Sequence, residues 1–202
     1  MTSFDEILAI YSRAGGAAYY GEPVTQAAHA LQAAYFAARA GAPPALVAAA
    51  LLHDIGHLIE PVPEDLADWS HDAEHELAGS RWLAARFGPA VTEPVRLHVA
   101  AKRWLCATQP DYAARLSAAS VATLVLQGGP MRPEEAAAFA AEAHGRDAVR
   151  LRRWDDEAKQ VGLAVPDFAA YRGLIQALAV GAPAPATAAA AADFAARARP
   201  LK

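Results

Sequence analysis

The sequence contains one cysteine, Cys106, and this scarcity excludes two kinds of architecture. A single thiol cannot close an intramolecular disulfide, nor can it supply a zinc site built from several thiolates. The chain also lacks a basic leader segment near its start and any uninterrupted apolar run long enough to cross a bilayer. We therefore expect a cytoplasmic protein that has no membrane partner.

The chain also carries no large excess of one charge sign. The 18 basic and 22 acidic residues are mixed along the chain and leave a formal net charge of -4. Nucleic-acid-binding proteins usually carry a basic patch, so we expect no nucleic acid partner. A small molecule is the expected ligand, and the sequence leaves the oligomeric state open.

Strand signals are scarce, whereas helical patterns bounded by glycine and proline fill most of the 202 residues. We expect a single-domain, all-α bundle over residues 1–180 and an Ala/Pro-rich tail over 181–202. Residues 59–71, rich in proline and acids, should form a loop that acts as a lid. The helices are expected at roughly 3–13, 23–40, 43–58, 72–87, 92–106, 110–127, 133–143, 147–160 and 167–179.

The segment ALLHDIGH places ligand-type side chains at the end of an apolar helix. Asp54 follows the apolar run directly, with His53 beside it and His57 one helical turn after His53. Burying an ionised aspartate is costly unless the carboxylate is paired or coordinates a metal. The segment therefore predicts a cation next to Asp54.

Histidines on other predicted helices extend this site. A short turn from Gly41 to Pro44 makes the two flanking helices antiparallel, so that His29 can face His53. The remaining candidates lie on later helices and are His75, His98 and Asp155. Any one histidine alone is more often a hydrogen-bonded core or surface residue than a ligand.

Taken together, four imidazoles and two carboxylates exceed what one ion needs if solvent and substrate must also bind. They suit two ions that share one carboxylate. Asp156 competes with Asp155 for the last position, and the residue pattern alone does not choose between them.

The pattern H…HD…D, formed by His29, His53, Asp54 and Asp155, resembles the HD superfamily of metal-dependent phosphohydrolases, which are helical bundles. His75 and His98 resemble the extra ligands of its two-metal branch. Longer segments are similar to the HD-domain oxygenases of phosphonate degradation, a group related to myo-inositol oxygenase. These segments are YYGEPVTQAAHALQAA, AALLHDIGH, LHVAAKRWL, LQGGPM and RRWDDEAK, and the resemblance covers roughly residues 4–179.

In that group a mixed-valence di-iron centre uses dioxygen to cleave the C–P bond of 2-amino-1-hydroxyethylphosphonate, giving glycine and phosphate. The resemblance implies two iron ions, dioxygen as co-substrate and an organophosphonate substrate for this chain. It implies one iron held by His29, His53, Asp54 and Asp155, and another held by Asp54, His75 and His98. It favours Asp155 over Asp156, because the family's ligand directly follows the tryptophan.

Helical spacing also places two cationic side chains on the same faces as predicted metal ligands. Lys102 lies one helical turn after His98, and Arg152 lies three residues before Asp155. The resemblance makes these two cations part of a phosphonate cradle that also contains Ser120, Thr123 and His57.

Two residues near the start of the resemblance complete the expected site. By resemblance, Tyr19 covers one iron until substrate displaces it. Glu22, which we take as the one acid near the site without a metal to bind, receives the ammonium group of the substrate.

Three other functions fit parts of this pattern. The ligands would serve an HD-type phosphohydrolase acting on a phosphate ester, although hydrolysis does not require Tyr19 or Glu22. An oxygenase for another 1-hydroxyphosphonate would differ only in substrate contacts. A catalytically silent module that senses a phosphonate or phosphate is disfavoured by the intact set of ligands.

Overall fold

The computed structural model describes residues 2–19, 22–59 and 74–181. Apart from their first residues, the predicted lid over 59–71 and the predicted tail over 181–202 lie outside this part of the chain. None of the described helices combines the length and the apolar character that a membrane crossing requires.

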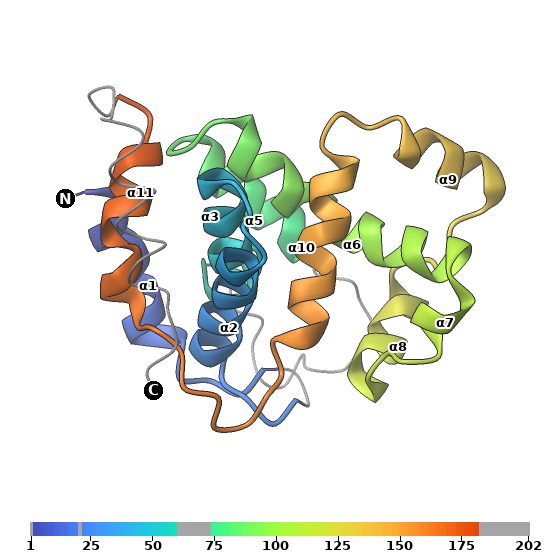
Figure 1. Cartoon of the computed structure of the whole chain (residues 1–202), viewed down its shortest axis with the longest axis horizontal. Coiled ribbons are helices and arrows are strands. Elements are labelled where there is room, and N and C mark those ends of the chain that lie inside the picture. The colour runs from blue at the N-terminus through green and yellow to red at the C-terminus, as the bar shows by residue number, and fades with distance from the viewer. Residues whose placement is uncertain (1, 20–21, 60–73, 182–202) are drawn as a thin grey trace.

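Every regular element of the described chain is a helix, as predicted. The elements are α1 (Ser3–Ala14), α2 (Gln26–Arg39), α3 (Pro44–Leu52), α4 (Gly56–Ile59), α5 (His75–Ala84), α6 (Pro89–Thr108), α7 (Pro110–Ala113), α8 (Ala118–Leu126), α9 (Pro133–Ala140), α10 (Gly145–Glu157), the 3-10 helix η2 (Phe168–Tyr171) and α11 (Arg172–Leu178) (Figure 1). Strand-like pairing among described residues is limited to two isolated bridges, Ala18 with Thr25 and Phe87 with Ala179.

Helix α3 forms the centre of the core. Its sequence PALVAAALL is apolar on all sides, and α2, α6, α10 and α11 each pack against it. Its residues Leu51 and Leu52 are fully buried. A helix that is apolar all round is stable in water only when neighbours cover every face, and this arrangement meets that requirement.

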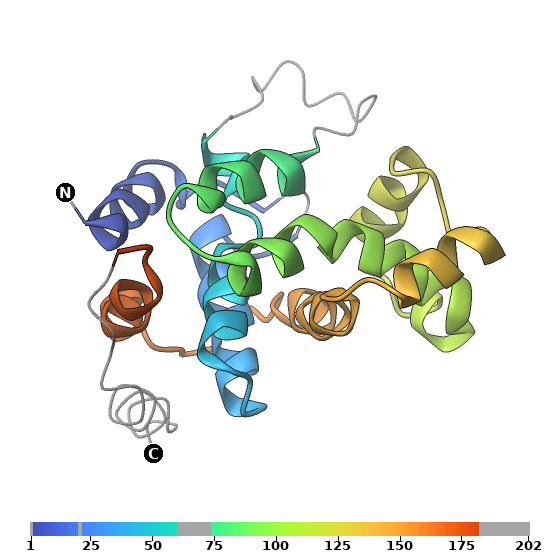
Figure 2. The ribbon, with the colours of Figure 1, turned by 90° about the horizontal axis from the view of Figure 1, so that it is seen from above.

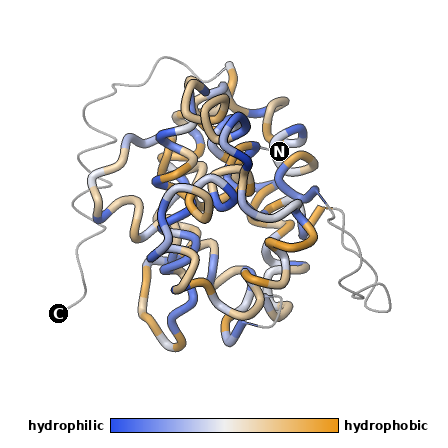
Figure 3. Tube along the Cα trace, turned by 90° about the vertical axis from the view of Figure 1, so that its right-hand side faces the viewer, coloured by the Kyte–Doolittle hydropathy of each residue, from blue (hydrophilic) through white to orange (hydrophobic). Residues whose placement is uncertain are grey.

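The remaining helices lie on either side of this centre. Helices α1 and α11 lie at one end of the molecule, and α7, α8 and α9 lie at the other, beyond α10 (Figures 1 and 2). Hydropathy changes along most helices, as expected where one face contacts the core and another contacts solvent (Figure 3). The long α6 runs from the core to the α7–α9 end and connects the two parts.

Two predicted helices are interrupted in the structure. The predicted helix over 43–58 breaks at residues 53–55, so that α3 ends before the HD pair and α4 begins after it. The predicted helix over 110–127 divides into α7 and α8, because Ser117 accepts a hydrogen bond from the Ser120 amide and caps a new helix. Both predictions of a continuous helix were wrong.

Candidate metal centre

Five segments that are distant in the sequence converge beside the core. His29 comes from α2, the HD pair from the turn between α3 and α4, His75 from the start of α5, His98 from α6 and Asp155 from α10. All six side chains are buried or nearly so. The structure thus brings together every predicted ligand.

The first group of donor atoms surrounds His29 and His53. Their Nε2 atoms lie 3.1 Å apart. Oδ2 of Asp54 lies 3.5 Å from Nε2 of His29 and 3.3 Å from Nε2 of His53. Oδ1 of Asp155 lies 3.3 Å from Nε2 of His29. The donor atoms of His29, His53 and Asp54 all lie within 4.8 Å of one another, close enough to ligate a single metal ion.

The second group surrounds His75 and His98. Their Nε2 atoms also lie 3.1 Å apart, and Oδ1 of Asp54 lies 3.3 Å and 3.5 Å from them, respectively. Asp54 therefore presents one carboxylate oxygen to each group. This is the arrangement expected of a carboxylate shared between two adjacent ions.

Backbone carbonyls orient three of the four imidazoles. A carbonyl oxygen accepts a hydrogen bond from Nδ1, which places the proton on Nδ1 and leaves the lone pair of Nε2 for a metal. The three contacts are His29 with Ala158 at 2.8 Å, His53 with Ala50 at 2.9 Å and His98 with Val95 at 2.7 Å.

The site requires positive charge. Oδ2 of Asp54 and Oδ1 of Asp155 are buried and accept no hydrogen bond from a described residue. Burial lowers the pKa of His53, but the Asp54 carboxylate outweighs this effect and raises that pKa to about 9. Without a metal, the carboxylates would thus draw a proton onto an imidazole. The donor set therefore fits metal cations, since they would supply the same charge.

Close packing between α4 and α5 explains why the HDIGH segment has a glycine, Gly56. A Cβ atom at this position would lie 2.0 Å from the backbone oxygen of His75 and 3.0 Å from the backbone nitrogen of Gly79. Only a residue without a side chain lets α4 approach α5 this closely. The contact brings His75 within reach of Asp54.

The predicted phosphonate residues lie on α6, α8 and α10. Nζ of Lys102 donates a hydrogen bond to Oγ1 of Thr123 at 2.9 Å. Lys102 is only 2% exposed, and burial, together with the nearby Arg152 charge, lowers its pKa to about 7. A buried cation of this kind gains from a bound anion.

Arg152 is also buried, but it already has acidic partners. Its Nη1 lies 2.7 Å from Oδ2 of Asp155, and its guanidinium also contacts both oxygens of Asp156. The hydroxyl of Ser120 lies 3.5 Å from its Nη2. Arg152 therefore links a predicted metal ligand with a predicted phosphonate residue.

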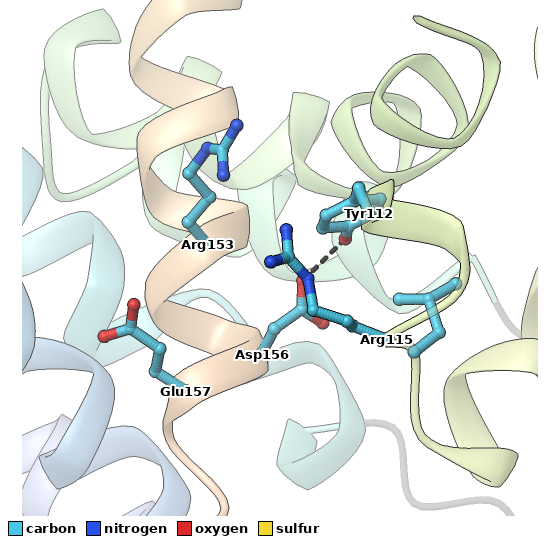
Figure 4. A pocket seen from close by; sticks show the side chains of 6 residues that line it. Tyr112, Arg115, Arg153, Asp156 and Glu157 are labelled. Carbon is cyan, nitrogen blue, oxygen red and sulfur yellow. Dashed lines mark hydrogen bonds between the residues drawn. The ribbon is translucent and has the colours of Figure 1, made fainter. Parts of the chain in front are cut away.

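The structure places Asp155, and not Asp156, against His29. Oδ2 of Asp156 accepts a hydrogen bond of 2.5 Å from Oη of Tyr112, on the side of α10 that faces α7. Asp156 lines a separate pocket there with Tyr112, Arg115, Arg153 and Glu157 (Figure 4).

Two aromatic rings cover the candidate ligands. The ring of Tyr19 stacks on His29 with centroids 3.9 Å apart, and the ring of His57 stacks on His75 at the same distance. Burial and the Asp54 charge raise the pKa of Tyr19 well above its ordinary value. Burial and the nearby His75 lower the pKa of His57 well below its ordinary value. Both side chains are therefore neutral near pH 7.

Glu22 is linked to the site by Lys159, a residue that was not among the predicted site residues. Its Oε1 lies 2.9 Å from Nζ of Lys159 and accepts a hydrogen bond of 2.5 Å from Oγ of Ser117. Burial raises the pKa of Glu22, but Lys159 and Ser117 outweigh it and hold that pKa below its ordinary value.

The surroundings of Glu22 differ from the prediction in two respects. Glu22 is not the one acid near the site without a metal to bind, because Glu76 lies 3.5 Å from His75 and Asp156 contacts Arg152. Lys159 was overlooked, although the spacing of Arg152, Asp155 and Lys159 by three and four residues follows one helical face. That spacing could have identified it.

Comparison with known families agrees with this geometry. The model of the HD domain matches residues 27–143, which include five of the six candidate ligands. The chain belongs to the HD-domain family. Within the family it is 48% identical over 157 residues to a hydroxymethylphosphonate dioxygenase of Gimesia maris, covering 77% of this chain and 78% of the relative.

A second relative acts on a larger compound. The chain is 42% identical over 167 residues to the [1-hydroxy-2-(trimethylamino)ethyl]phosphonate dioxygenase (glycine-betaine-forming) of Leisingera caerulea, covering 83% of this chain and 85% of the relative. The expected grouping of this HD-domain chain with the oxygenases of phosphonate degradation is confirmed.

Proposed function

We propose that this HD-domain protein is an iron-dependent oxygenase that cleaves the C–P bond of 2-amino-1-hydroxyethylphosphonate and yields glycine and phosphate. The observation that carries the proposal is the pair of donor groups bridged by Asp54, with the buried cation of Lys102 on the same helix as His98. Two relatives that act on phosphonates support a phosphonate as the substrate class.

The metal in this proposal is iron. Imidazole and carboxylate ligands suit non-haem iron, and no thiolate is required. His29, His53, Asp54 and Asp155 would hold one ion, and Asp54, His75 and His98 would hold the other. When bound, the two ions would supply the binding of dioxygen and the electron transfer that C–P cleavage needs.

The cationic side chains would bind the phosphonate. Lys102 gains a charge-assisted hydrogen bond when an anion enters, because in the described part of the chain its ammonium donates to a neutral group, the Thr123 hydroxyl. Arg152 and Ser120 would contribute from the facing helices. His57, which burial keeps neutral, would offer a hydrogen bond without adding charge.

Tyr19 and Glu22 would control access and recognition. Tyr19, stacked on His29, would cover the first metal position until substrate displaces it. Glu22 would receive the substrate ammonium, since its lowered pKa keeps it ionised near pH 7. A carboxylate is the group that an amine-bearing substrate requires.

Product analysis tests this proposal. Iron-loaded protein is incubated in air with 2-amino-1-hydroxyethylphosphonate, and phosphate and glycine are followed by phosphorus and proton NMR. Equal amounts of the two products are expected from the wild-type protein, and none from Asp54→Ala. Release of phosphate from a phosphate monoester, with the phosphonate left intact, would instead indicate a phosphohydrolase.

A further inference from the structure

The segment that follows α10 is fixed to α2 on both sides of Lys159. The Ala158 carbonyl accepts a hydrogen bond of 2.8 Å from Nδ1 of His29. The side-chain amide of Gln32 binds the backbone of Gln160 twice, at 2.8 Å through its Nε2 and at 3.0 Å through its Oε1. Because His29 and Gln32 are both buried, Lys159 begins from a well-anchored backbone.

The side chain of Lys159 enters the candidate substrate site. Its Nζ lies 2.9 Å from Oε1 of Glu22, 3.1 Å from Oγ of Ser120 and 3.3 Å from Oγ of Ser117. It also lies 5.9 Å from the centre of the Tyr19 ring. The Lys159 and Glu22 side chains are only 14% and 10% exposed, which separates this ion pair from an ordinary surface pair.

We propose that Lys159 is a specificity-determining residue. Its ammonium pairs with the Glu22 carboxylate and competes for that carboxylate with the ammonium of a bound substrate. The inference rests on the proposed function and deepens it. A single carboxylate that already binds one cation attracts a second cation much less strongly. A substrate with an amine must therefore displace Lys159 or share its partner, whereas a substrate without one leaves the ion pair intact.

This competition defines the substrate class. With Lys159 in place, its ammonium largely neutralises the charge of Glu22, so the preference of this carboxylate for a cationic substrate is weakened. The chain should therefore accept 1-hydroxyphosphonates both with and without an ammonium group. Removal of the Lys159 charge would convert this broad selectivity into a preference for 1-hydroxyphosphonates that carry an ammonium group.

Binding in the absence of dioxygen measures this preference without turnover. The dissociation constants of 2-amino-1-hydroxyethylphosphonate and hydroxymethylphosphonate are determined by calorimetry on the iron-loaded, full-length protein. In Lys159→Met, affinity for the amine compound relative to hydroxymethylphosphonate should rise about tenfold. Lys159→Arg keeps the charge and should leave this ratio within about twofold of the wild-type value.

A matched control separates the ion pair from net charge. Arg153→Met removes one exposed cation from α10 that donates to Gln109 and does not contact Glu22, so the ratio should not change. Lys159→Gln is a second uncharged variant, to be used if circular dichroism shows that Lys159→Met is misfolded. It should shift the ratio in the same direction as Lys159→Met.

Two results would overturn the inference. An equal loss of affinity for both phosphonates in the uncharged variants would make Lys159 an anion-binding residue. An unchanged ratio of the two affinities would show that the substrate ammonium does not compete with Lys159 for Glu22. Either failure differs from failure of the proposed function, which would appear as phosphonate binding without phosphate release in air.

Discussion

Arg152 and Asp155 form an ion pair in which Nη1 of Arg152 lies 2.7 Å from Oδ2 of the carboxylate. The other oxygen, Oδ1, lies 3.3 Å from Nε2 of His29. One carboxylate thus contacts a cation of the proposed phosphonate cradle and a candidate ligand of the first metal position. Occupancy of that position and binding of the anion should therefore be coupled.

Replacing Arg152 with alanine should affect both properties. The change leaves Asp155 and Asp156 close together without their shared cation, and loss of one partner of a buried ion pair costs about 3 kcal/mol or more. We expect a lower free energy of unfolding of the metal-free protein, together with reduced iron content. Lys102→Met should retain full iron content while it loses phosphonate affinity. Denaturant unfolding and iron analysis distinguish the two variants, and full iron content in Arg152→Ala would contradict the coupling.

Asp54 should be the one ligand whose loss affects both metals, because each of its oxygens faces a different pair of imidazoles. We expect Asp54→Ala to bind almost no iron. His98→Ala should retain the ion beside His29 and lose mainly the other one. Iron content per chain, measured after identical loading, checks this prediction. Equal residual iron in the two variants would exclude Asp54 as the bridge.

The pKa of Lys102 predicts how stability depends on pH. Because burial lowers that pKa from 10.5 to about 7, the folded protein binds fewer protons than the unfolded chain between these values. The contribution of Lys102 to stability therefore rises as pH increases through this window and is constant below it. Consequently, the stability of Lys102→Met relative to wild type should fall by about 2 kcal/mol from pH 7 to pH 9. Urea unfolding of both proteins at the two pH values tests this, and a constant difference would show that Lys102 has an ordinary pKa.

Gly56 should be essential for the position of His75. In Gly56→Ala, the new methyl group would meet the His75 carbonyl, so α5 must move away from α4. We expect loss of the ion held by His75 and His98, with a destabilisation of about 2 kcal/mol or more. Gly173→Ala in α11 is a matched control, because a Cβ there meets no atom within 4 Å. Iron content and thermal unfolding of the two variants provide the test. Equal behaviour would show that α4 and α5 do not need this close contact.

The sequence predicted the parts of the fold and site that depend on local patterns. Apolar periodicity gave the all-α fold, and the short turn after Gly41 correctly placed His29 opposite His53. The carboxylate of Asp54 within an apolar segment indicated a buried cation site, and the buried, unsatisfied oxygen of Asp54 agrees with that reasoning.

The features that the sequence did not predict depend on tertiary contacts. The break at residues 53–55 directly precedes the close approach of Gly56 to α5, a tertiary contact that no local propensity encodes. The Lys159–Glu22 ion pair joins residues 137 positions apart. It arises because His29 and Gln32 hold the segment after α10, and these contacts appear only once α2 and α10 are packed together.

C–P cleavage in this protein should consume dioxygen. The most direct measurement compares oxygen uptake with phosphate release when iron-loaded protein is given 2-amino-1-hydroxyethylphosphonate. Conversion of the substrate to glycine and phosphate adds both atoms of dioxygen, so one molecule of oxygen should disappear for each phosphate released, and no phosphate should form under argon. Phosphate release at the same rate under argon would show that dioxygen is not consumed and would identify a hydrolytic reaction at this site.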